Sequence, residues 1–571
     1  MLTLANRSEF HTLLDAIALN GDEAERDAII YLETDRAPRR IARREFRSNV
    51  LAQANALKRL GLDDRDLVII AHTQNLESIY AFWGALVAGA IPSMFPTLTE
   101  KLDPDIYLRS MAALVRLSHA RAVLTTAEFA PQMRETVPCP VYASSDLAGM
   151  TNLAGFQNPR GLAPDEIAFL QHSSGTTGLQ KGVALSHRAV LNQIASYSDA
   201  LALTAQDVIV SWLPLYHDMG LIAGFLLPLM QGVPLVLMSP FDWVQHPAML
   251  FRAIHDYRGT LCWLPNFAYN HSARRIRQRD TEGLSLSSLR LFINCSEPVR
   301  ADSHQQFLDR FAAQGVTRAQ LAVSYALAEN TFAVTQTPIG QAARWEVIDQ
   351  VALETDRVAR PIAPDQPHAQ IRVSCGPAIA GTTVKVIDDY GHPRPDRHVG
   401  QIAVQSDCML SGYYQRPDLQ PVVDGWFRTG DMGYIADGEI YVVGRSTDLI
   451  INAGKNIYPQ DIEAIVNTVP GVHVGRAVAF GVFDDREGTE LIGVVAEVDA
   501  VEPIERQRIA QAIRHAAVRH SQITLSYVQL VDDRWLIKTS SGKIARAANR
   551  AKWLAETQPH SLSISGEAAG R

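Results

Sequence analysis

Cysteine is scarce and scattered in this sequence, and neither sign of charge dominates it. The five cysteines lie at positions 139, 262, 295, 375 and 408, an odd number without any C-x-x-C pair. This pattern argues against a disulfide framework or a zinc site and is typical of a reducing cytosol, so we expect a cytoplasmic protein. The net charge is −8 with no long run of one sign, which predicts no nucleic-acid surface.

Long hydrophobic runs are also missing, with one exception. The first ten residues lack the basic start and apolar core of a signal peptide. Residues 219–238 carry no charge, but Pro228, Gly232 and Pro234 interrupt them. Such a break inside a bilayer would leave backbone polar groups without partners. We therefore expect a buried helix followed by a short strand at residues 235–238, and no membrane span.

Two common nucleotide-binding signatures are absent. The glycine-rich segment at residues 172–182 (HSSGTTGLQKG) does not match G-x-x-x-x-G-K-[ST], which argues against P-loop ATPases and kinases. No strand is followed by G-x-G-x-x-G with an acid about twenty residues later, which argues against a NAD-dependent dehydrogenase. The segment instead follows an apolar run at residues 167–170. Such a strand and loop can gather N–H groups and a lysine around phosphate, although an ordinary turn has a similar composition.

The length and the order of elements predict an α/β fold with more than one domain. A chain of 571 residues exceeds one compact core. Short apolar strands at 67–71, 121–125 and 208–211 alternate with helical patterns at 76–89 and 246–257, which is typical of parallel sheets. Half-buried strands with alternating pattern follow residue 370. Beyond Arg445 we expect a smaller mixed region whose last helix starts at Lys543.

Two clusters in the first part of the chain could carry chemistry. His217 and Asp218 are adjacent within apolar sequence, and they could form a catalytic pair or a hydrogen-bonded core pair. Residues 294–299 (NCSEPV) follow a predicted strand at 289–293. They are expected to form a loop at the carboxyl edge of a sheet, where ligands bind in open α/β folds.

Three clusters in the second part have similar potential. Tyr325 and Glu329 could face the same way on a helical turn, so that the ring stacks on a base and the carboxylate holds Mg²⁺. Asp431 lies between glycines and could accept hydrogen bonds from a ribose diol. Lys543 belongs to a second hydroxyl-rich loop before a helix and could reach an anion. The alternatives are a packed tyrosine with a solvated glutamate, an Asp-stabilised turn and a capped helix.

Taken in order and spacing, these segments resemble the motif set of the adenylate-forming superfamily, which comprises acyl-CoA synthetases, peptide-synthetase adenylation domains and luciferases. The resemblance covers about residues 10–555. It implies a large N-terminal domain of layered parallel α/β sheets with a small β-barrel-like subdomain at residues 1–444. It also implies a mobile α+β lid domain at residues 445–556, and residues 557–571 are expected to be a disordered tail.

The resemblance also implies cofactors and site residues. ATP and Mg²⁺ are expected, with Lys181, His217 and Lys543 in catalytic roles, Glu329 as the magnesium ligand and Thr447 at the hinge between the domains. The residues expected to bind the nucleotide are Ser173, Ser174, Gly175, Thr176, Thr177, Gly178, Asn294, Ser296, Glu297, Pro298, Tyr325, Asp431 and Arg445. An acyl pocket is expected at Met219, Trp263, Phe267 and Tyr269, residues that could equally be core.

Within the superfamily the chain looks like the fatty-acyl-AMP ligase branch. The features that carry this are residues 215–221 (LYHDMGL), 265–269 (PNFAY) and 458–463 (YPQDIE), together with Ala328 before Glu329. About forty residues also separate Glu329 from Val373, and that branch carries an extra segment thought to hinder the domain rotation needed to use CoA. The chain departs from the family at His172, Gln180, Thr447 and Ile537, none of which is an expected phosphate or magnesium ligand.

The resemblance implies activation of a fatty acid as acyl-AMP, with release of pyrophosphate. Transfer to the phosphopantetheine thiol of an acyl carrier protein would follow. A fatty-acyl-CoA synthetase that uses free CoA is the alternative within enzymes. A catalytically silent homologue that binds adenylate is a remote third, because Lys543, Glu329 and Asp431 are all present.

Overall fold

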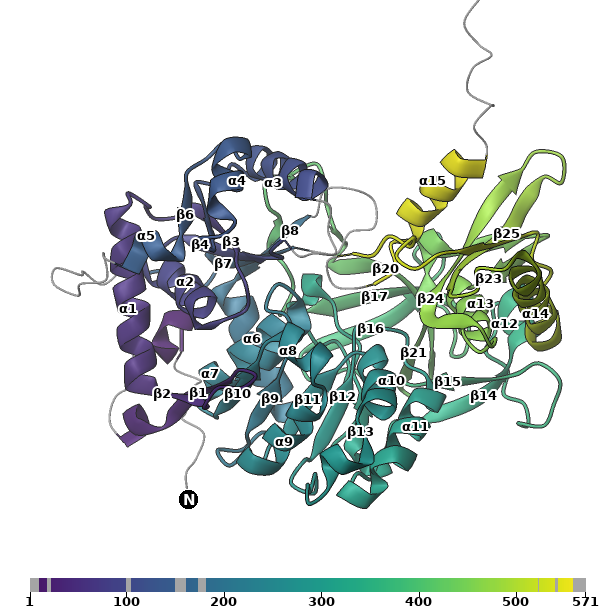
Figure 1. The fold of residues 1–571 in the computed structure, drawn as a ribbon, viewed down its shortest axis with the longest axis horizontal. Coiled ribbons are helices and arrows are strands. Elements are labelled where there is room, and N and C mark those ends of the chain that lie inside the picture. Colours follow the sequence, from purple (N-terminus) through teal and green to yellow (C-terminus); the bar gives the residue numbers. More distant parts are fainter. Residues whose placement is uncertain are drawn as a thin grey trace, which may run out of the picture.

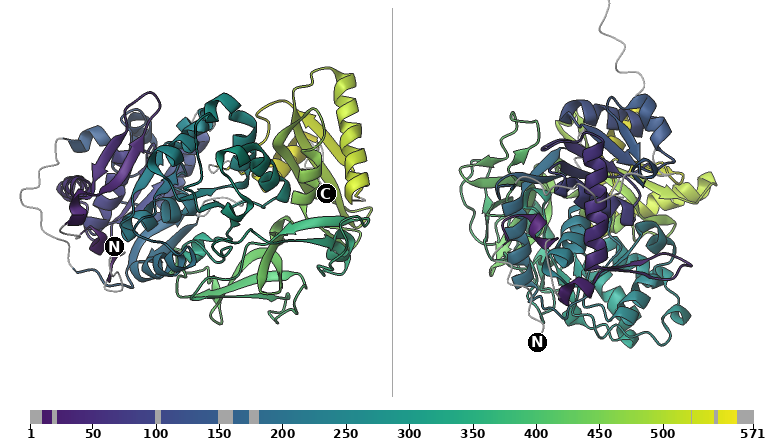
Figure 2. Two further views of the ribbon diagram at one scale, coloured as in Figure 1. Left: turned by 90° about the horizontal axis from the view of Figure 1, so that it is seen from below. Right: turned by 90° about the vertical axis from the view of Figure 1, so that its left-hand side faces the viewer.

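The computed structural model describes residues 10–17, 22–98, 104–148, 161–172, 181–521, 523–539 and 543–557. Two seven-stranded sheets form the large part of the molecule, and Figure 1 shows the small C-terminal part at the opposite end of its long axis from helices α1 (Arg43–Arg59) and α2 (Leu76–Val87). Figure 2 shows the same separation from below. The predicted α/β fold class is confirmed.

The first sheet combines parallel strands with an antiparallel edge. Strand β3 is buried at all five positions and pairs in parallel with β4 and β5, as expected for an apolar run covered on both faces. Strands β7 and β8, which flank the glycine-rich segment, are antiparallel. In spatial order the strands are β18 (Gly412–Tyr413), β8 (Gly182–Ser186), β7 (Ile167–His172), β4 (Ile91–Phe95), β3 (Leu67–Ala71), β5 (Ala122–Thr125) and β6 (Val141–Ala143).

The second sheet is parallel except for its last strand, β2. In spatial order its strands are β13 (Leu321–Val323), β12 (Leu291–Asn294), β11 (Leu261–Leu264), β9 (Ile209–Ser211), β10 (Leu235–Met238), β1 (Asp27–Leu32) and β2 (Arg39–Ala42). One apolar core includes side chains from both sheets and from α1, α2 and α6 (His187–Ala200). The two sheets and these helices therefore pack as one body.

Further helices accompany the two sheets. Those beside the first sheet are α3 (Pro104–Ser118), α4 (Ala130–Thr136) and α5 (Ser144–Ala148). The helices that alternate along the chain with strands β10 to β13 of the second sheet are α8 (Pro240–Gln245), α9 (Ala248–Tyr257), α10 (Asn266–Arg275) and α11 (Ala301–Phe311).

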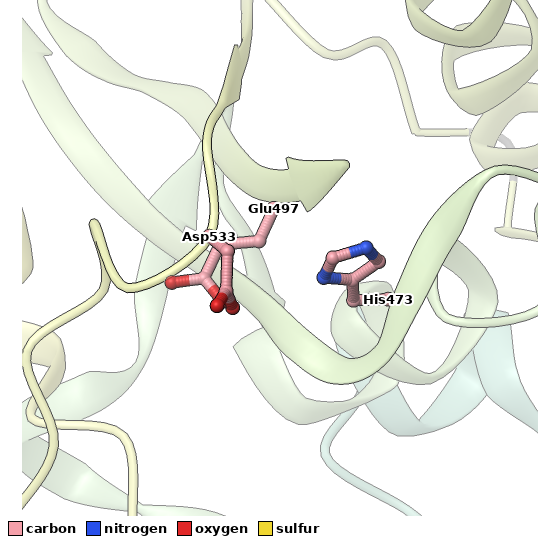
Figure 3. Close-up of side chains that lie close together, drawn as sticks. All are labelled: His473, Glu497 and Asp533. Carbon is pink, nitrogen blue, oxygen red and sulfur yellow. The ribbon is translucent and has the colours of Figure 1, made fainter. Parts of the chain in front are cut away.

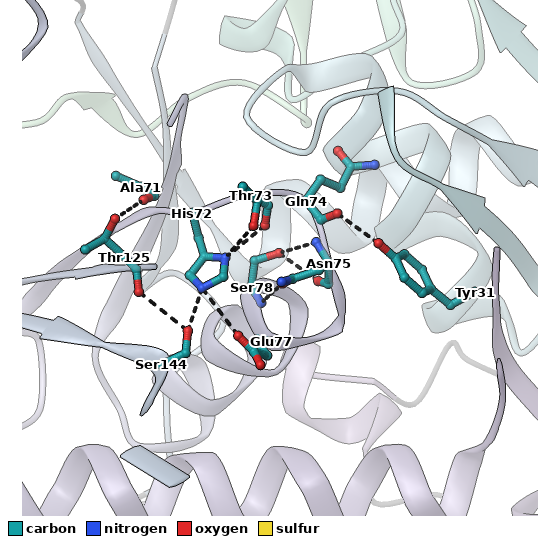
Figure 4. A network of polar contacts seen from close by, with 10 residues as sticks. All are labelled: Tyr31, Ala71, His72, Thr73, Gln74, Asn75, Glu77, Ser78, Thr125 and Ser144. Atoms are coloured by element: carbon teal, nitrogen blue, oxygen red, sulfur yellow. Dashed lines mark hydrogen bonds and ion pairs between the residues drawn. The ribbon is translucent and has the colours of Figure 1, made fainter. Parts of the chain in front are cut away.

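The loop after β3 links the two sheets beside the candidate site (Figure 4). The side-chain carbonyl of Gln74 accepts the Leu215 N–H at 3.0 Å, and its backbone carbonyl accepts the Tyr31 hydroxyl at 3.1 Å. His72 fixes the same loop, because its Nε2 lies 2.5 Å from Ser144 Oγ and its Nδ1 lies 3.0 Å from the Thr73 carbonyl oxygen. This network holds the segment that leads to His217 against the end of the first sheet.

The uncharged run at residues 219–238 forms a buried π-helix, η4 (Met219–Leu226), a short helix α7 (Leu227–Gln231) and strand β10. The predicted order of helix and strand is confirmed. Gly232 ends α7 with a φ of 74°, a left-handed conformation that suits glycine. Within the described ranges, no helix is long and apolar enough to cross a membrane.

A third region is antiparallel. The expected small barrel-like subdomain is an open five-stranded sheet. Its strands are β16 (Thr382–Ile387), β17 (Gly400–Ser406), β19 (Val422–Val423), β20 (Trp426–Ala436) and β21 (Glu439–Arg445). The segment before it forms the hairpin β14 (Trp345–Asp349) and β15 (Ala369–Val373), with α12 (Gln350–Thr355) between the strands.

The C-terminal part has its own sheet and its own apolar clusters. Its elements are β22 (Ile450–Asn452), β23 (Lys455–Ile457), α13 (Pro459–Val466), β24 (Val472–Asp484), β25 (Thr489–Val498), α14 (Pro503–Ser521), β26 (Tyr527–Val531) and α15 (Arg546–Thr557). The predicted start of the last helix at Lys543 is wrong by three residues. Lys538 and Ile544 pair as an isolated β-bridge, and Lys543 precedes the helix by three residues. The tail expected to be disordered lies outside the described residues, apart from Thr557, which ends α15.

Candidate active site

The carboxyl end of β12 places one wall of the site. Asn294 is the last residue of β12 and is fully buried, and its amide nitrogen lies 3.1 Å from Asn266 Oδ1. Ser296 follows with a φ of 72°, which is uncommon outside glycine. Glu297 accepts the Phe267 N–H at 2.8 Å, and Pro298 is exposed before α11 begins. The expected βα loop is therefore present, with strand β12 starting two residues later than predicted.

His217 and Asp218 lie at the start of the π-helix. His217 Nδ1 is 2.6 Å from Asp218 Oδ1, and Asp218 also accepts the Met219 N–H at 2.7 Å as the N-cap of η4. Burial raises the pKa of Asp218, but His217, Lys543 and the Met219 N–H together outweigh it and hold this pKa below its usual value. Asp218 is therefore a buried carboxylate that lies against His217 and is stabilised by Lys543.

Lys543 reaches this wall from the C-terminal part of the chain. It acts electrostatically on Asp218, Glu297 and Cys295. Burial raises the pKa of Glu297, an effect that the Phe267 N–H and then Lys543 partly offset. The backbone at Lys543 is held by the bridge between Lys538 and Ile544 and by a 2.7 Å hydrogen bond from the Thr539 N–H to the Lys543 carbonyl oxygen.

Tyr325, Asp431 and Arg445 form a second group at the site. The Tyr325 hydroxyl donates to Asp431 Oδ2 at 2.5 Å, and the Arg445 Nε donates to Asp431 Oδ1 at 3.2 Å. Asp431 and Arg445 are paired residues of β20 and β21, so the antiparallel register brings them together. The Asp431 carboxylate is the main cause of the raised pKa of Arg445.

Glu329 lies between the two groups. Its carboxylate accepts the Tyr413 hydroxyl at 2.9 Å, and it interacts electrostatically with Asp218 and Arg445. Burial raises its pKa, although its own N–H and Tyr413 partly counteract this. The expected shared helical turn is wrong: Glu329 belongs to the 3-10 helix η8 (Ala328–Asn330), whereas Tyr325 precedes that helix and forms its hydrogen bond with Asp431.

Lys181 and Tyr413 are brought together by strand pairing. Lys181 is exposed just before β8, and its Nζ lies 4.9 Å from the centre of the Tyr413 ring on the neighbouring strand β18. Sequence reasoning missed Tyr413, which occurs in an unremarked Gly-Tyr-Tyr segment 84 residues after Glu329. Ser173, Ser174, Gly175, Thr176, Thr177 and Gly178 lie outside the described residues.

The four expected acyl-pocket residues have different surroundings. Met219 lies beside the site, with its sulfur 3.9 Å from Ser296 Oγ, and Phe267 is 42% exposed against Trp212 and Trp243. Trp263 is buried and donates to the Tyr197 hydroxyl at 2.8 Å. Tyr269 is buried against His304 and Phe307. The structure therefore joins Met219 and Phe267 to the site, while Trp263 and Tyr269 pack in the core.

The expected hinge residue Thr447 is exposed in the 3-10 helix η9 (Ser446–Asp448). The neighbouring Asp448 forms an ion pair with Arg546 of α15, which also contacts Glu463 at 2.7 Å. The connection between the large and small parts is thus tied to the helix that follows Lys543.

Comparisons with known proteins agree on one family. Residues 19–414 match the family model described as AMP-binding enzyme. The medium-chain-fatty-acid–[acyl-carrier-protein] ligase JamA of Moorena producens is 31% identical, covering 97% of this chain and 96% of JamA. The long-chain-fatty-acid–AMP ligase FadD32 of Mycolicibacterium smegmatis is 31% identical, with 91% and 90% covered.

A solved structure gives the same result in three dimensions. It comes from structural and functional studies of fatty acyl-adenylate ligases from E. coli and L. pneumophila, and it superimposes with a TM-score of 0.88 at 28% identity. The superposition covers 97% of this chain and 98% of that chain.

Proposed function

The chain belongs to the AMP-binding enzyme family, and we propose that it is an AMP-forming ligase that activates a fatty acid and passes the acyl group to an acyl carrier protein. One observation carries the proposal. Lys543 of the small part acts on Asp218 and Glu297 of the large part, beside the Tyr325–Asp431–Arg445 group and Glu329. A site assembled from both parts of the chain is suited to a reaction that gathers several charged groups.

The first step forms the acyl-adenylate. An oxygen of the fatty carboxylate attacks the α-phosphorus of ATP, the bond from that phosphorus to the bridging oxygen breaks, and pyrophosphate leaves. Because carboxylate and triphosphate repel each other, the step needs cations near the reacting atoms. We assign this role to Lys543, and we assign Lys181 and the loop of residues 173–178 to the phosphates. Asp431 and Tyr325 are assigned to ribose and adenine, and His217 to the junction of the acyl group and α-phosphate.

The second step transfers the acyl group. The phosphopantetheine sulfur attacks the acyl carbonyl carbon, the carbon–oxygen bond to phosphate breaks, and AMP leaves while the thiol proton is released. We propose that residues 445–556 act as a lid that rotates about residues 445–448 between the two steps. The exposure of η9 and the ion pair between Asp448 and Arg546 support a hinge that moves with α15.

The donor set at Glu329 fits Mg²⁺. Its carboxylate has a pKa raised by burial, and such a group gains from a nearby cation. A hard oxygen donor is the ligand type that Mg²⁺ binds together with substrate phosphates. When bound there, Mg²⁺ would neutralise phosphate charge, while Tyr413 would orient the Glu329 carboxylate.

We propose a carrier protein rather than free CoA as the acceptor. The named activity of JamA supports this choice. The contacts that the segment between Glu329 and Val373 makes with the small part also support it. Arg372 of β15 binds Asp461 of α13 with contacts of 2.8 and 3.2 Å, and Asn456 donates to the Glu354 carbonyl oxygen at 3.1 Å. These contacts restrain the small part against the segment at residues 345–373. A CoA synthetase remains the second candidate because both enzymes share the adenylation step.

An exchange assay tests the adenylation step. Purified protein with ATP, Mg²⁺ and labelled pyrophosphate is expected to form labelled ATP only when a fatty acid is present. Medium- and long-chain acids should be compared, because the relatives differ in the chain length that their names give. Exchange that does not depend on any fatty acid would contradict the proposal.

A further inference from the structure

Three side chains on neighbouring elements of the small part, none of them among the residues of the candidate active site, lie close together (Figure 3). They are His473 on β24, Glu497 on β25 and Asp533 in the turn after β26. One potential ligand atom from each residue lies within 4.8 Å of the other two. The three donors come from three adjacent strands or strand ends, so they are gathered by the sheet rather than by one flexible loop.

Glu497 is the central group of this cluster. Its side chain is completely buried, and its Oε1 accepts the Leu536 N–H at 2.8 Å. Its Oε2 is also buried and accepts no hydrogen bond, and it forms an ion pair with Arg476 Nη1 at 3.4 Å. A buried carboxylate oxygen without a donor is costly unless a cation lies close to it. Oε2 is therefore balanced in charge by Arg476 but receives no hydrogen bond, which leaves it able to coordinate a metal ion.

The backbone of β24 directs His473 toward this carboxylate. The pairing of β24 with β25 is irregular between Val472 and Ala477, and Gly475 within that stretch has a φ of 74°. Such irregularities change the direction of side chains along a strand. One nitrogen of the His473 ring faces the carboxylates in Figure 3 and the other points away.

Asp499 fixes the orientation of this ring. His473 Nε2 lies 2.9 Å from Asp499 Oδ1, which leaves Nδ1 to bind an ion. A carboxylate on the far nitrogen of a histidine is the usual support for a metal-binding imidazole, because it sets the tautomer and the ring plane.

We propose that His473, Glu497 and Asp533 bind a divalent transition-metal ion of the Zn²⁺ type. An imidazole nitrogen with two carboxylate oxygens suits Zn²⁺ better than Mg²⁺, and water would complete four-coordination. Asp533 is the most exposed of the three residues, with 57% of its side chain accessible, so rotation of this carboxylate can bring the donors closer to one ion. The cysteine pattern argues against a zinc site, but this donor set contains no cysteine.

The ion would brace the segment that presents Lys543. Asp533 begins this segment, Leu536 is bonded to Glu497, and Lys538 pairs with Ile544 directly after Lys543. A metal would attach Asp533 to Glu497 of β25, and the hydrogen bond already attaches Leu536 to the same residue. Both ends of the stretch from Asp533 to Leu536 would then be fixed. The ion is thus assigned a positioning role and takes no part in the reaction.

Zinc binding by the full-length protein tests this proposal. The protein is treated with a chelator, dialysed, and titrated with ZnCl₂ in an excess of Mg²⁺, with the bound zinc measured by elemental analysis and the melting temperature measured in parallel. We expect one zinc ion per chain and a rise in melting temperature. Asp533→Asn should abolish this binding, and Asp499→Asn should weaken it about tenfold.

The controls separate this site from others. His392→Asn alters an exposed histidine that lies 3.3 Å from Asp388, and it should leave zinc binding unchanged. Asp533 is exposed, so its substitution tests ion binding without disturbing a buried position. Substitution of Glu497 would disturb one. Zinc bound equally by wild type and Asp533→Asn, for example at His217 and Asp218, would overturn the proposal. Absence of bound zinc in the wild type would also overturn it and leave Glu497 paired with Arg476 alone.

Discussion

Among single residues, Lys543 connects the two parts of the proposed enzyme. It is the lysine that acts on both Asp218 and Glu297, and each of these carboxylates belongs to a different loop of the large part. It lies beside the bridge of Lys538 with Ile544, three residues before α15 begins.

Substitution of Lys543 tests its assignment. Lys543→Ala should lower the rate of acyl-adenylate formation by about two or more orders of magnitude, because it removes one preorganised charge at the reacting phosphate. The rate is measured as pyrophosphate release with saturating fatty acid. Lys552→Ala is a suitable control, since Lys552 stacks on Trp535 in the same part of the chain but away from the site. Equal rates for the two variants would refute the role.

Tyr413 provides a second test at this scale. Tyr413→Phe removes the hydroxyl that donates to Glu329, and it should raise the Mg²⁺ concentration needed for half-maximal activity about tenfold. The measurement is a Mg²⁺ titration of pyrophosphate release. Tyr414→Phe is the matched control, because Tyr414 packs against the core of the first sheet. A normal Mg²⁺ requirement in Tyr413→Phe would show that the hydroxyl does not orient a magnesium ligand.

At the residue level, order along the chain carries the signal for several site residues, whose roles stay predictions. The positions of His217, Glu329, Asp431 and Lys543 follow from motifs, and the structure brings them into one region. Tyr413 could not be found this way, because only the pairing of β18 with β8 brings it to Lys181. The direction of Tyr325 likewise depends on the distant strand that carries Asp431.

At the scale of elements, the segment with β14, α12 and β15 is the feature that bears on the acceptor. Its length follows from the spacing between Glu329 and Val373, but its hydrogen bonds to the small part do not, because they are made with residues 89 or more positions further along the chain. The buried pair of Arg372 and Asp461 is the strongest of these contacts by geometry, since it has two hydrogen bonds.

Breaking this pair should loosen the small part. Arg372→Ala removes both hydrogen bonds of this guanidinium to Asp461 and leaves that carboxylate with Gln370 and the 3.5 Å contact to Arg300. Loss of a buried ionic partner costs about 3 kcal/mol. If the segment restrains lid rotation, this variant should form acyl-CoA from free CoA faster than the wild type, as measured by product analysis. Arg360→Ala removes an exposed ion pair of the same segment and serves as the control. No difference between the two variants would mean that the segment does not select the acceptor.

For the whole molecule, buried histidines make stability depend on pH. Burial lowers the pKa values of His172, His187 and His304 to about 4 from the usual 6.5. Their uncharged forms are thus favoured in the folded state, and the unfolded chain takes up more protons below pH 6.5. The stabilisation that these three histidines contribute should therefore be fully present above about pH 6.5 and fall toward pH 4, by at most about 1.4 kcal/mol per pH unit for each histidine.

His187 allows this dependence to be measured in one variant. Its Nδ1 accepts the Leu13 N–H at 3.2 Å, so protonation there removes an acceptor that holds the N-terminal segment. His187→Asn keeps a possible acceptor but does not titrate. Its free energy of unfolding should change less with pH between about 6.5 and 4 than that of the wild type. An identical slope in urea unfolding would argue against this contribution.

The central claim is that this enzyme makes an acyl-adenylate for a carrier protein, and a competition experiment tests it most directly. Purified enzyme is given ATP, Mg²⁺, a panel of fatty acids, free CoA and a phosphopantetheinylated acyl carrier protein, and the products are analysed by mass spectrometry. The account predicts acyl-AMP and acylated carrier protein with little acyl-CoA. Rapid formation of acyl-CoA in place of the acylated carrier would contradict it and identify a CoA synthetase.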